Sequence, residues 1–309
     1  MKRGLGRLGL LLGGVVLSLG LAEGLVRVLG LAPDIGFLSV NRPQGSFVAS
    51  VDEVLRYVPM PGSPGVSGQG LRDRDHDIAP DSVSVAVLGD SIGWGFCNWD
   101  GPLPLEDGFP WLLEESLGVD VINLSVSGYD TRQEVRMLEV AGLQFGPDVV
   151  LVAATPNDRW PMASNEFELL HRQEGWEEHR QLSALRKNVL YRFHLTRLLL
   201  VRFAEPAPPE PALGTDSDDP VDAGFRRLKR LAAEHDFEIR VALFPDPKAP
   251  SDHLEEQIAA HGLTSLDMSK VLTDRGDHYS PCSAMHPNTE GHRLAAEALA
   301  PFVAEALPR

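Results

Sequence analysis

The chain has 309 residues, of which 43% are hydrophobic and 23% charged, an ordinary composition for a folded protein with one large or two small domains. Its 44 acidic residues outnumber its 28 basic residues and give a formal net charge of −16. Because a negative field repels phosphate backbones, this charge argues against a nucleic-acid partner, and we expect none.

Residues 1–31 have the pattern of a targeting segment, in which a basic start is followed by an apolar run over residues 8–22. The run is shorter than the about 20 residues that span a bilayer, and a longer span would carry Glu23 and Arg27 into hydrocarbon. Two interpretations stay open: a cleaved signal peptide, or an uncleaved anchor that attaches the protein to a membrane. A buried core helix fits the basic start less well. Both open interpretations favour an extracytoplasmic protein, periplasmic or secreted.

Residues 32–82 are rich in Gly, Pro, Ser and charge, which predicts an irregular lead-in lying over a domain at 83–309. In that domain, apolar runs typical of buried strands alternate with helical patterns. Strands are expected at residues 83–88, 119–123, 148–153, 238–244 and 263–267, and helices at 109–117, 131–145, 221–236, 252–261 and 288–307. This alternation predicts an α/β fold, a three-layer α/β/α sandwich around a five-stranded parallel sheet.

Polar segments follow three of the expected strands, and another precedes the last helix. Gly89-Asp90-Ser91 follows the first strand, residues 123–128 follow the second, and residues 155–158 follow the third, while His286 stands before the closing helix. Because the carboxyl ends of parallel strands share one edge of a sheet, we expect these segments to meet in one site.

These segments resemble, in the same order, the sequence blocks of the SGNH hydrolases, also called the GDSL family. The matching segments are Gly89-Asp90-Ser91 (with Ile92 where the family has Leu), Asn123 to Gly128, Asn157-Asp158, and His286 to His292. The resemblance covers about residues 83–307, less the segment 159–220. It implies the SGNH hydrolase fold, which is flavodoxin-like.

The resemblance implies that Ser91 is the nucleophile and that His286 is the base that takes its proton, a task suited to imidazole near neutral pH. It also implies an oxyanion hole made of the backbone N–H groups of Ser91 and Gly128 and the side-chain amide of Asn157. Each residue type also has a structural explanation: a helix-capping serine, a surface histidine, a turn glycine and a loop-binding asparagine.

Two neighbouring carboxylates, Asp90 and Asp158, are expected to support the site by holding its loops with hydrogen bonds rather than to take part in chemistry. The second histidine of the last segment, His292, falls inside the expected helix and is expected to be structural.

Two residues depart from the family pattern. Thr155 stands where the third block often begins with Gly, which affects the shape of that loop. Ser283 stands three residues before His286, where the family usually has the Asp that orients the imidazole. Disturbing that partner costs ~10⁴ in rate in another serine hydrolase. A Ser–His dyad assisted by a backbone carbonyl, or a carboxylate from Asp277 or Asp274, remains open.

The chain has two cysteines, Cys97 six residues after Ser91 and Cys282 four residues before His286. If Ser91 and His286 meet, the two cysteines are neighbours, and disulfides persist in exported proteins. We therefore predict a Cys97–Cys282 bridge that holds the two loops together. Two free buried thiols are the alternative.

An interruption at residues 159–220 separates the third strand from the next helix. Residues 182–203 have helical spacing with basic residues interleaved, and a Pro- and Asp-rich stretch follows. We interpret the segment as an insertion that is helical in its first part and disordered in its Pro- and Asp-rich end. Its helix is expected to pack on its own domain, and two other interpretations stay open: a cap over the site, or a helix that lies on a membrane surface.

The sequence therefore predicts an extracytoplasmic serine hydrolase that cleaves O-acyl or O-acetyl esters of a lipid, a glycan or a small molecule. Two alternatives use the same fold: an O-acyltransferase acting on a glycan, and a catalytically inactive binding protein. No metal-ligand spacing or nucleotide-binding motif is found, so we expect no metal and no cofactor.

Overall fold

The computed structural model describes residues 2–29, 47–50, 52, 54–55, 57–78, 82–98, 101–159, 193, 195, 219–246, 249–274, 276–283 and 285–308. The chain divides into two compact units, one formed by Met1–Ser39 and Ser164–Pro211 and the other by Val40–Ala163 and Ala212–Arg309. Most of the expected insertion at 159–220, with its expected helix at 182–203, lies outside the described residues.

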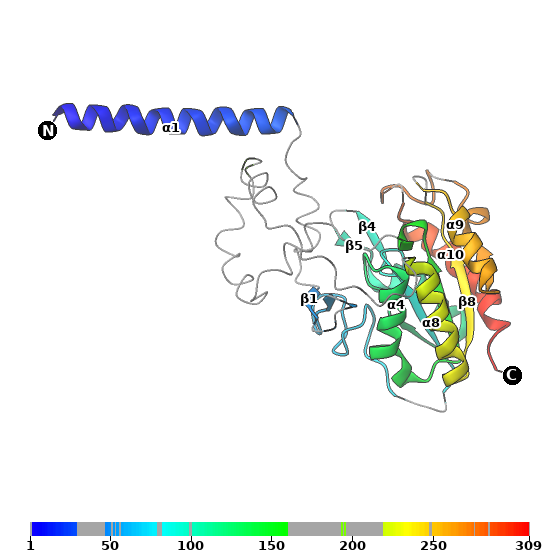
Figure 1. Ribbon diagram of the computed structural model, residues 1–309. Helices are drawn as coiled ribbons and strands as arrows, with labels where there is room; N and C mark the ends of the chain where they lie inside the picture. The colour runs from blue at the N-terminus through cyan, green and yellow to red at the C-terminus, as the bar shows by residue number, and fades with distance from the viewer. Residues whose placement is uncertain are drawn as a thin grey trace. The chain divides into compact units, whose positions relative to one another are not determined.

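The first unit contains helix α1 (Lys2–Val28), drawn in blue in Figure 1. Leucines along the helix, among them Leu17 and Leu21, are exposed. Near its end the Arg27 guanidinium pairs with the Glu23 carboxylate at 2.8 Å, and Glu23 also accepts the Leu195 N–H of the same unit. Among the described helices, none has the combination of length and apolar character that crossing a membrane requires.

The second unit is built on a parallel sheet of five strands, in the order β6-β3-β7-β8-β9. The strands are β3 (Ser84–Gly89), β6 (Asp120–Asn123), β7 (Val149–Ala154), β8 (Glu238–Leu243) and β9 (Thr264–Asp267). Every residue of β3 and β7 is buried, because helices cover both faces of the sheet there. The predicted three-layer α/β/α sandwich is confirmed.

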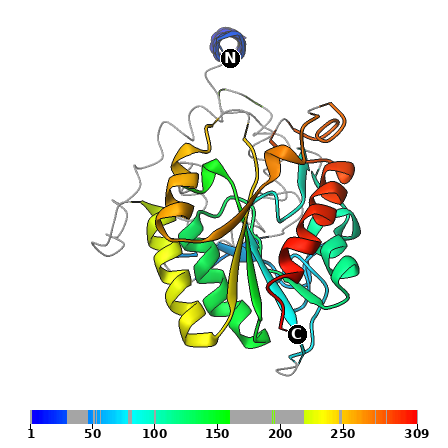
Figure 2. The ribbon, with the colours of Figure 1, turned by 90° about the vertical axis from the view of Figure 1, so that its right-hand side faces the viewer.

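Helices form the two outer layers (Figure 2). On one face α3 (Phe109–Leu117) packs against α10 (Thr289–Ala304), and on the other α4 (Thr131–Met137) packs against α8 (Pro220–His235), with α9 (Asp252–Ala260) beside α8. Apolar side chains of the sheet, α3 and α10 form one continuous core. Short 3-10 turns at η1 (Leu105–Asp107), η4 (Pro156–Arg159) and η5 (Met268–Lys270) join these elements.

The expected helix over residues 131–145 is regular only in its first half. The α-helix α4 ends at Met137, and a wider π-helical stretch, Leu138–Gly142, and a 3-10 turn, Leu143–Phe145, complete the segment. Gly142 lies directly against Leu124, where a β-carbon would come within 2.4 Å of the Leu124 Cδ1. The apolar spacing does not distinguish a regular helix from this mixed one.

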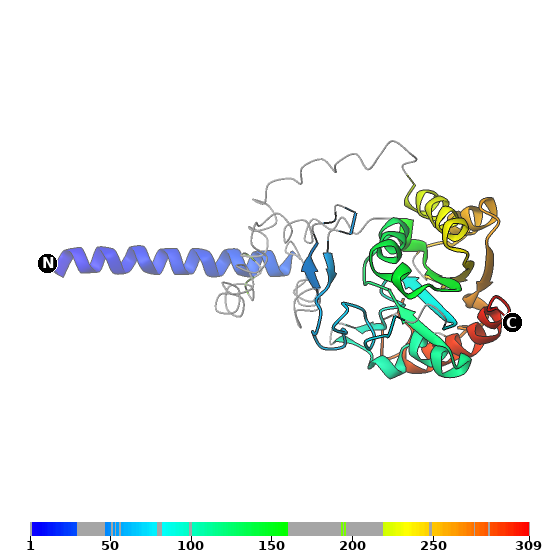
Figure 3. The ribbon, with the colours of Figure 1, turned by 90° about the horizontal axis from the view of Figure 1, so that it is seen from below.

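Two short antiparallel strand pairs that the sequence did not predict lie on either side of β3 in the chain. β1 (Phe47–Ala49) and β2 (Tyr57–Pro59) form an antiparallel pair, and β4 (Phe96–Asn98) and β5 (Gly101–Pro102) form a second one after β3. Figure 3 shows the β1–β2 pair beside the sheet domain. Strands of two or three residues are too short to show a period of two in the sequence.

Candidate active site

Ser91 stands on the tight turn that follows β3. The Asp90 carboxylate accepts the Ile92 N–H at 3.0 Å, and the Asp90 carbonyl accepts the Trp94 N–H at 3.1 Å. Gly93 closes the turn against the loop after β6, and a β-carbon there would lie 2.0 Å from the Ser125 Oγ. The turn therefore needs glycine at position 93, and it leaves Ser91 half-buried at the carboxyl edge of the sheet.

His286 meets Ser91 at this edge. Its Nε2 lies 2.8 Å from the Ser91 Oγ, and its Nδ1 lies 2.5 Å from the Ser283 Oγ. The Phe96 ring packs edge-on against the imidazole, with 4.6 Å between the ring centroids. The imidazole therefore lies between two hydroxyl groups and is held on one side by an aromatic ring.

The segment that carries His286 is fixed by Asn288, the N-cap of α10. The Asn288 side-chain oxygen accepts the Gly291 N–H at 2.9 Å, and its side-chain N–H group donates to the carbonyls of Asp277 and Ser280 at 2.7 and 2.6 Å. Asp277 is exposed. The sequence leaves several groups as candidates to orient the imidazole. In the structure the Ser283 hydroxyl is the candidate that contacts Nδ1.

Cys97 and Cys282 form a disulfide bond. It joins β4, which follows the Ser91 turn, to the segment that carries Ser283 and His286. A backbone hydrogen bond from the Ser283 N–H to the Cys97 carbonyl, at 2.9 Å, runs beside it. The turn that carries Ser91 and the segment that carries His286 are thus joined covalently at a point close to both.

Asn157, in η4 after β7, reaches the same turn. Its side-chain N–H group donates to the Asp90 Oδ2 at 2.9 Å, and the Ser91 Oγ lies 3.1 Å from that oxygen. Gly128 has φ +84°, a left-handed conformation that favours glycine. Among the described residues, no acceptor takes a hydrogen bond from the backbone N–H of Ser91 or of Gly128. Within that described part, both N–H groups are free to donate to a ligand.

Behind Asn157 lies a layer of buried polar side chains. Asp158 has no exposed surface, and it accepts the Thr155 N–H at 2.7 Å. Burial, followed by the nearby Asp90 charge, raises the pKa of Asp158 well above its usual value. Glu134 of α4 is also buried, which raises its pKa well above the usual range, and neither of its carboxyl oxygens has a hydrogen-bond partner among the described residues.

Two contacts that sequence reasoning missed join the lead-in to the site. The buried Arg72 donates to the Trp94 carbonyl of the Ser91 turn at 3.1 Å. The Tyr57 hydroxyl donates to the Ser127 carbonyl, one residue before Gly128, at 2.8 Å. Neither residue stands in a motif, and no pattern within the lead-in identifies a partner so far along the chain.

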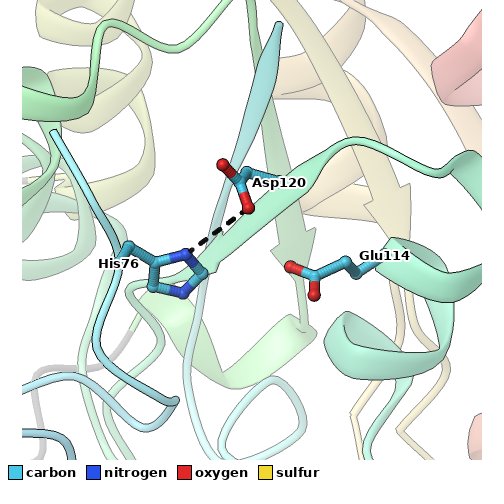
Figure 4. Close-up of side chains that lie close together, drawn as sticks. All are labelled: His76, Glu114 and Asp120. Atoms are coloured by element: carbon cyan, nitrogen blue, oxygen red, sulfur yellow. Dashed lines mark ion pairs between the residues drawn. The ribbon is translucent and has the colours of Figure 1, made fainter. Parts of the chain in front are cut away.

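One group of metal-ligand residues occurs elsewhere in the described chain: His76, Glu114 and Asp120 have potential ligand atoms within 4.8 Å of one another (Figure 4). The Arg74 guanidinium lies among them, 2.7 Å from Glu114, 3.2 Å from Asp120 and 3.1 Å from the His76 Nδ1. Because this guanidinium supplies the positive charge that the carboxylates need, the group is an ion-pair network joining the lead-in to α3 and β6.

Comparison with known proteins gives one family and several similar folds. The GDSL-like Lipase/Acylhydrolase family matches residues 87–294. No curated protein matches the sequence. Similar solved structures include a lipase/acylhydrolase from Enterococcus faecalis (17% identity, 73% of this chain and 97% of that chain, TM-score 0.43) and a putative lipolytic protein of the G-D-S-L family from Desulfitobacterium hafniense DCB-2 (15%, 71% and 98%, 0.42). A psychrotrophic esterase from Pseudoalteromonas sp. is also similar (14% identity, 72% of this chain and 97% of that chain, TM-score 0.42).

The family match begins within β3, just before the Ser91 turn, and ends within α10, beyond His286. It therefore contains the whole carboxyl edge of the sheet at which these side chains meet. The chain belongs to the GDSL-like lipase/acylhydrolase family, and it is a carboxylic ester hydrolase.

Proposed function

We propose that the protein is an extracytoplasmic serine hydrolase that cleaves O-acyl or O-acetyl esters carried by a lipid, a glycan or a small molecule. The observation that carries the proposal is the line of side chains Ser91, His286 and Ser283, joined by contacts of 2.8 and 2.5 Å. A serine hydroxyl becomes a useful nucleophile when a base can take its proton, and His286 is in hydrogen-bond reach of it.

In the proposed reaction the Ser91 Oγ attacks the acyl carbonyl while the His286 Nε2 takes the hydroxyl proton. The tetrahedral intermediate collapses when His286 gives this proton to the leaving alcohol, which leaves an acyl-Ser91 ester. A water molecule then attacks this ester with His286 again as base. The second collapse returns the proton to the Ser91 Oγ and releases the carboxylic acid.

The negative oxygen of each intermediate is stabilised by the backbone N–H groups of Ser91 and Gly128 and by the Asn157 amide. The support for this assignment is that the first two N–H groups are free within the described chain and that Asn157 contacts the Asp90 carboxylate beside Ser91. Donors fixed before the reaction stabilise charge without reorganisation, and the loss of one typically costs ~10²–10³ in rate.

Ser283 takes the orienting role that a carboxylate has in other serine hydrolases. With the proton of His286 on Nδ1, this N–H donates to the Ser283 Oγ and leaves Nε2 free to accept from Ser91. A hydroxyl fixes the tautomer and the ring orientation in the same way as a carboxylate. It stabilises the imidazolium less, because it carries no charge.

The proposed location outside the cytoplasm is supported by the disulfide, since such bonds persist in oxidising compartments, and by the basic and apolar pattern of residues 1–31. Fractionation of cells expressing the full chain, with N-terminal sequencing of the product, tests it. A protein that starts near Glu23 in the exported fraction indicates a cleaved signal, and an intact N-terminus in the membrane fraction indicates an anchor. Recovery in the cytoplasm with free thiols would contradict the proposed location.

A panel of p-nitrophenyl esters, from acetate upward, tests the activity and defines the acyl chain. We expect hydrolysis by the wild type and its loss in Ser91→Ala and in His286→Ala. Ser116→Ala, on the exposed surface of α3, is the matched control and should hydrolyse the esters like the wild type. Equal hydrolysis by Ser91→Ala would overturn the proposal. Acyl transfer that outpaces hydrolysis when a glycan is supplied would identify a transferase that uses the same residues.

A further inference from the structure

Thr155 occupies the position at which the family pattern often has glycine, and its hydroxyl touches two acceptor groups. The Thr155 Oγ1 lies 2.5 Å from the Asn157 Oδ1 and 2.7 Å from the Asp158 Oδ1. Thr155 is 4% exposed and Asp158 is 0% exposed, so water does not compete for these contacts. A hydroxyl carries one proton and can donate to only one of the two oxygens.

The position of the Asn157 amide decides which oxygen receives that proton. The Asn157 Nδ2 faces the Asp90 Oδ2 at 2.9 Å, so its Oδ1 faces Thr155 and needs a donor there. The Thr155 proton therefore goes to Asn157. The remaining contact, between the Thr155 Oγ1 and the Asp158 Oδ1, then lacks a proton unless the Asp158 carboxyl supplies it.

Turning the Asn157 amide over does not remove this need. Its Oδ1 would then face the Asp90 Oδ2, and the missing proton would fall on Asp90 instead. In either orientation one buried carboxyl carries a proton, and Asp158 is the carboxyl at which burial raises the pKa well above its usual value.

The surroundings of Asp158 also favour a neutral carboxyl. The ionisable groups that face it are Asp90, Asp130 and Glu134, all buried and all acidic. Arg132, next to this group, pairs with Asp130 at 2.9 Å. Within the described part of the chain, no Lys, Arg or His nitrogen lies at ion-pair distance from Asp158 or from Glu134. An unpaired charge in such a place is costly, whereas a proton removes the cost.

We propose that Asp158 is a neutral carboxylic acid that donates its proton to the Thr155 hydroxyl, which in turn donates to Asn157 and fixes the amide for the oxyanion. Asp158 and Thr155 are thus positioning residues that act through Asn157. The role rests on the proposed function, because it assigns Asn157 to the oxyanion hole. A neutral Asp158 also keeps a second negative charge away from the place where the oxyanion forms.

Variants at the two positions test the relay by ester hydrolysis. Thr155→Val keeps the shape and removes the hydroxyl, and we expect kcat to fall roughly 10- to 100-fold with little change in KM, since Asn157 acts on the transition state. Thr155→Ser restores the donor and should stay within about threefold of the wild type. Melting temperatures show whether each variant is folded.

Asp158→Asn separates a neutral acid from a carboxylate. The new amide can accept the Thr155 N–H with its oxygen and donate to the Thr155 Oγ1 with its nitrogen, which is the pattern assigned to the neutral acid. We expect Asp158→Asn to lower kcat by less than about threefold and Asp158→Leu to match Thr155→Val. A loss in Asp158→Asn as large as in Asp158→Leu, or wild-type kcat in Thr155→Val, would overturn the proposal.

The proton can also be observed without any activity. Carbon NMR of protein labelled with ¹³C at the aspartate carboxyl carbons measures it. The resonance that is missing from the spectrum of Asp158→Asn belongs to Asp158. In the wild type its chemical shift should stay at the value of a protonated acid between about pH 6 and 8. If Asp158→Asn does not fold, the resonance is assigned to Asp158 by the change of its chemical shift in Thr155→Val. A resonance at the ionised position refutes the relay even if esters are hydrolysed. Failure of the wild type on every ester refutes the proposed function and leaves the state of this carboxyl measurable.

Discussion

At the scale of single residues, the site differs from a triad that ends in a carboxylate, because the group against the His286 Nδ1 is the Ser283 hydroxyl at 2.5 Å. A hydroxyl can accept the Nδ1 proton and so fix the tautomer, but it adds no negative charge beside the imidazolium. The orientation of His286 then depends on this contact and on the packing of the Phe96 ring.

Ser283→Ala removes the acceptor for the Nδ1 proton and should lower kcat by roughly 10- to 100-fold, less than the ~10⁴ seen when a triad carboxylate is disturbed, because no charge is lost. The measurement is steady-state hydrolysis of the best ester from the panel. Ser280→Ala, an exposed position on the same segment, is the control. Equal activity of Ser283→Ala and Ser280→Ala would show that the hydroxyl does not orient the base.

His292 shows how a second histidine near the site is kept neutral. Burial, and secondarily the charge of His286, lowers the pKa of His292 to about 3, and the Phe109 N–H donates to its Nδ1 at 3.1 Å. In the unfolded chain the same group titrates near its ordinary value of 6.5. Between these two values the unfolded chain binds a proton that the folded chain does not, so stability falls as the pH falls.

His292→Gln keeps an acceptor for the Phe109 N–H and removes the titration. The free energy of unfolding of the wild type, minus that of this variant, should therefore shrink by about 1.4 kcal/mol for each pH unit below about 6.5. Urea unfolding from about pH 7 to about pH 4.5 measures it. A difference that stays constant with pH would show that His292 binds a proton equally well in the folded and the unfolded chain.

At the scale of elements, the layer that carries the acidic residues behind Asn157 depends on the close packing of α4 and α8. Gly224 of α8 lies against the first turn of α4, where a β-carbon would come within 2.7 Å of the Thr131 Cγ2 and 2.9 Å of its carbonyl oxygen. Backbone atoms cannot move aside as a flexible side chain can. Glycine at this position sets the distance between the two helices.

Gly224→Ala should therefore destabilise the protein by about 1–3 kcal/mol, the typical cost of overpacking, although alanine favours a helix. Thermal unfolding measures the loss. Ala233→Ser, at an exposed position of the same helix, should change the melting temperature little. An unchanged or higher melting temperature in Gly224→Ala would show that the helices separate at no cost.

At the scale of the whole molecule, the disulfide connects residues that are 185 positions apart in sequence. A cross-link that closes so long a loop removes much of the conformational freedom of the unfolded chain, which loop-closure entropy places at about 5 kcal/mol. The same bond holds the segment that carries His286 close to the turn that carries Ser91. Its loss is therefore expected to affect both folding and catalysis.

The double variant Cys97→Ser/Cys282→Ser should be less stable than the wild type by about 2–5 kcal/mol and should lose activity at temperatures where the wild type remains folded. Denaturant unfolding with and without reductant measures the change. Reductant should destabilise the wild type and leave the double variant unaffected. If reductant has no effect on the wild type, the two thiols are not bridged in the protein.

The fold follows from the sequence because its central strands β3 and β7 are nearly continuous apolar runs and several of its helices are amphipathic, so both signals are local. The meeting of Ser91 with His286 follows from topology, since parallel strands deliver their carboxyl ends to one edge. The choice between Ser283 and Asp277 as the partner of His286 depends on how a short segment turns, which the residue types do not determine.

The contacts from the lead-in were beyond prediction for a different reason. Tyr57 and Ser127 are 70 residues apart, and Arg72 and Trp94 are 22 residues apart, so no local pattern connects them. The proton on Asp158 likewise depends on three side chains and their burial together. The sequence predicts that Asp158 supports its loop, but the charge of this carboxyl depends on contacts that no local pattern specifies.

Covalent labelling of the full chain with a fluorophosphonate, read by intact mass and peptide mapping, tests directly whether Ser91 is the nucleophile. The wild type should gain a single adduct on Ser91, His286→Ala should label far more slowly, and Ser91→Ala should not label. A wild type that hydrolyses esters but carries the adduct on another residue, or carries none, would contradict the assignment of Ser91 as the nucleophile.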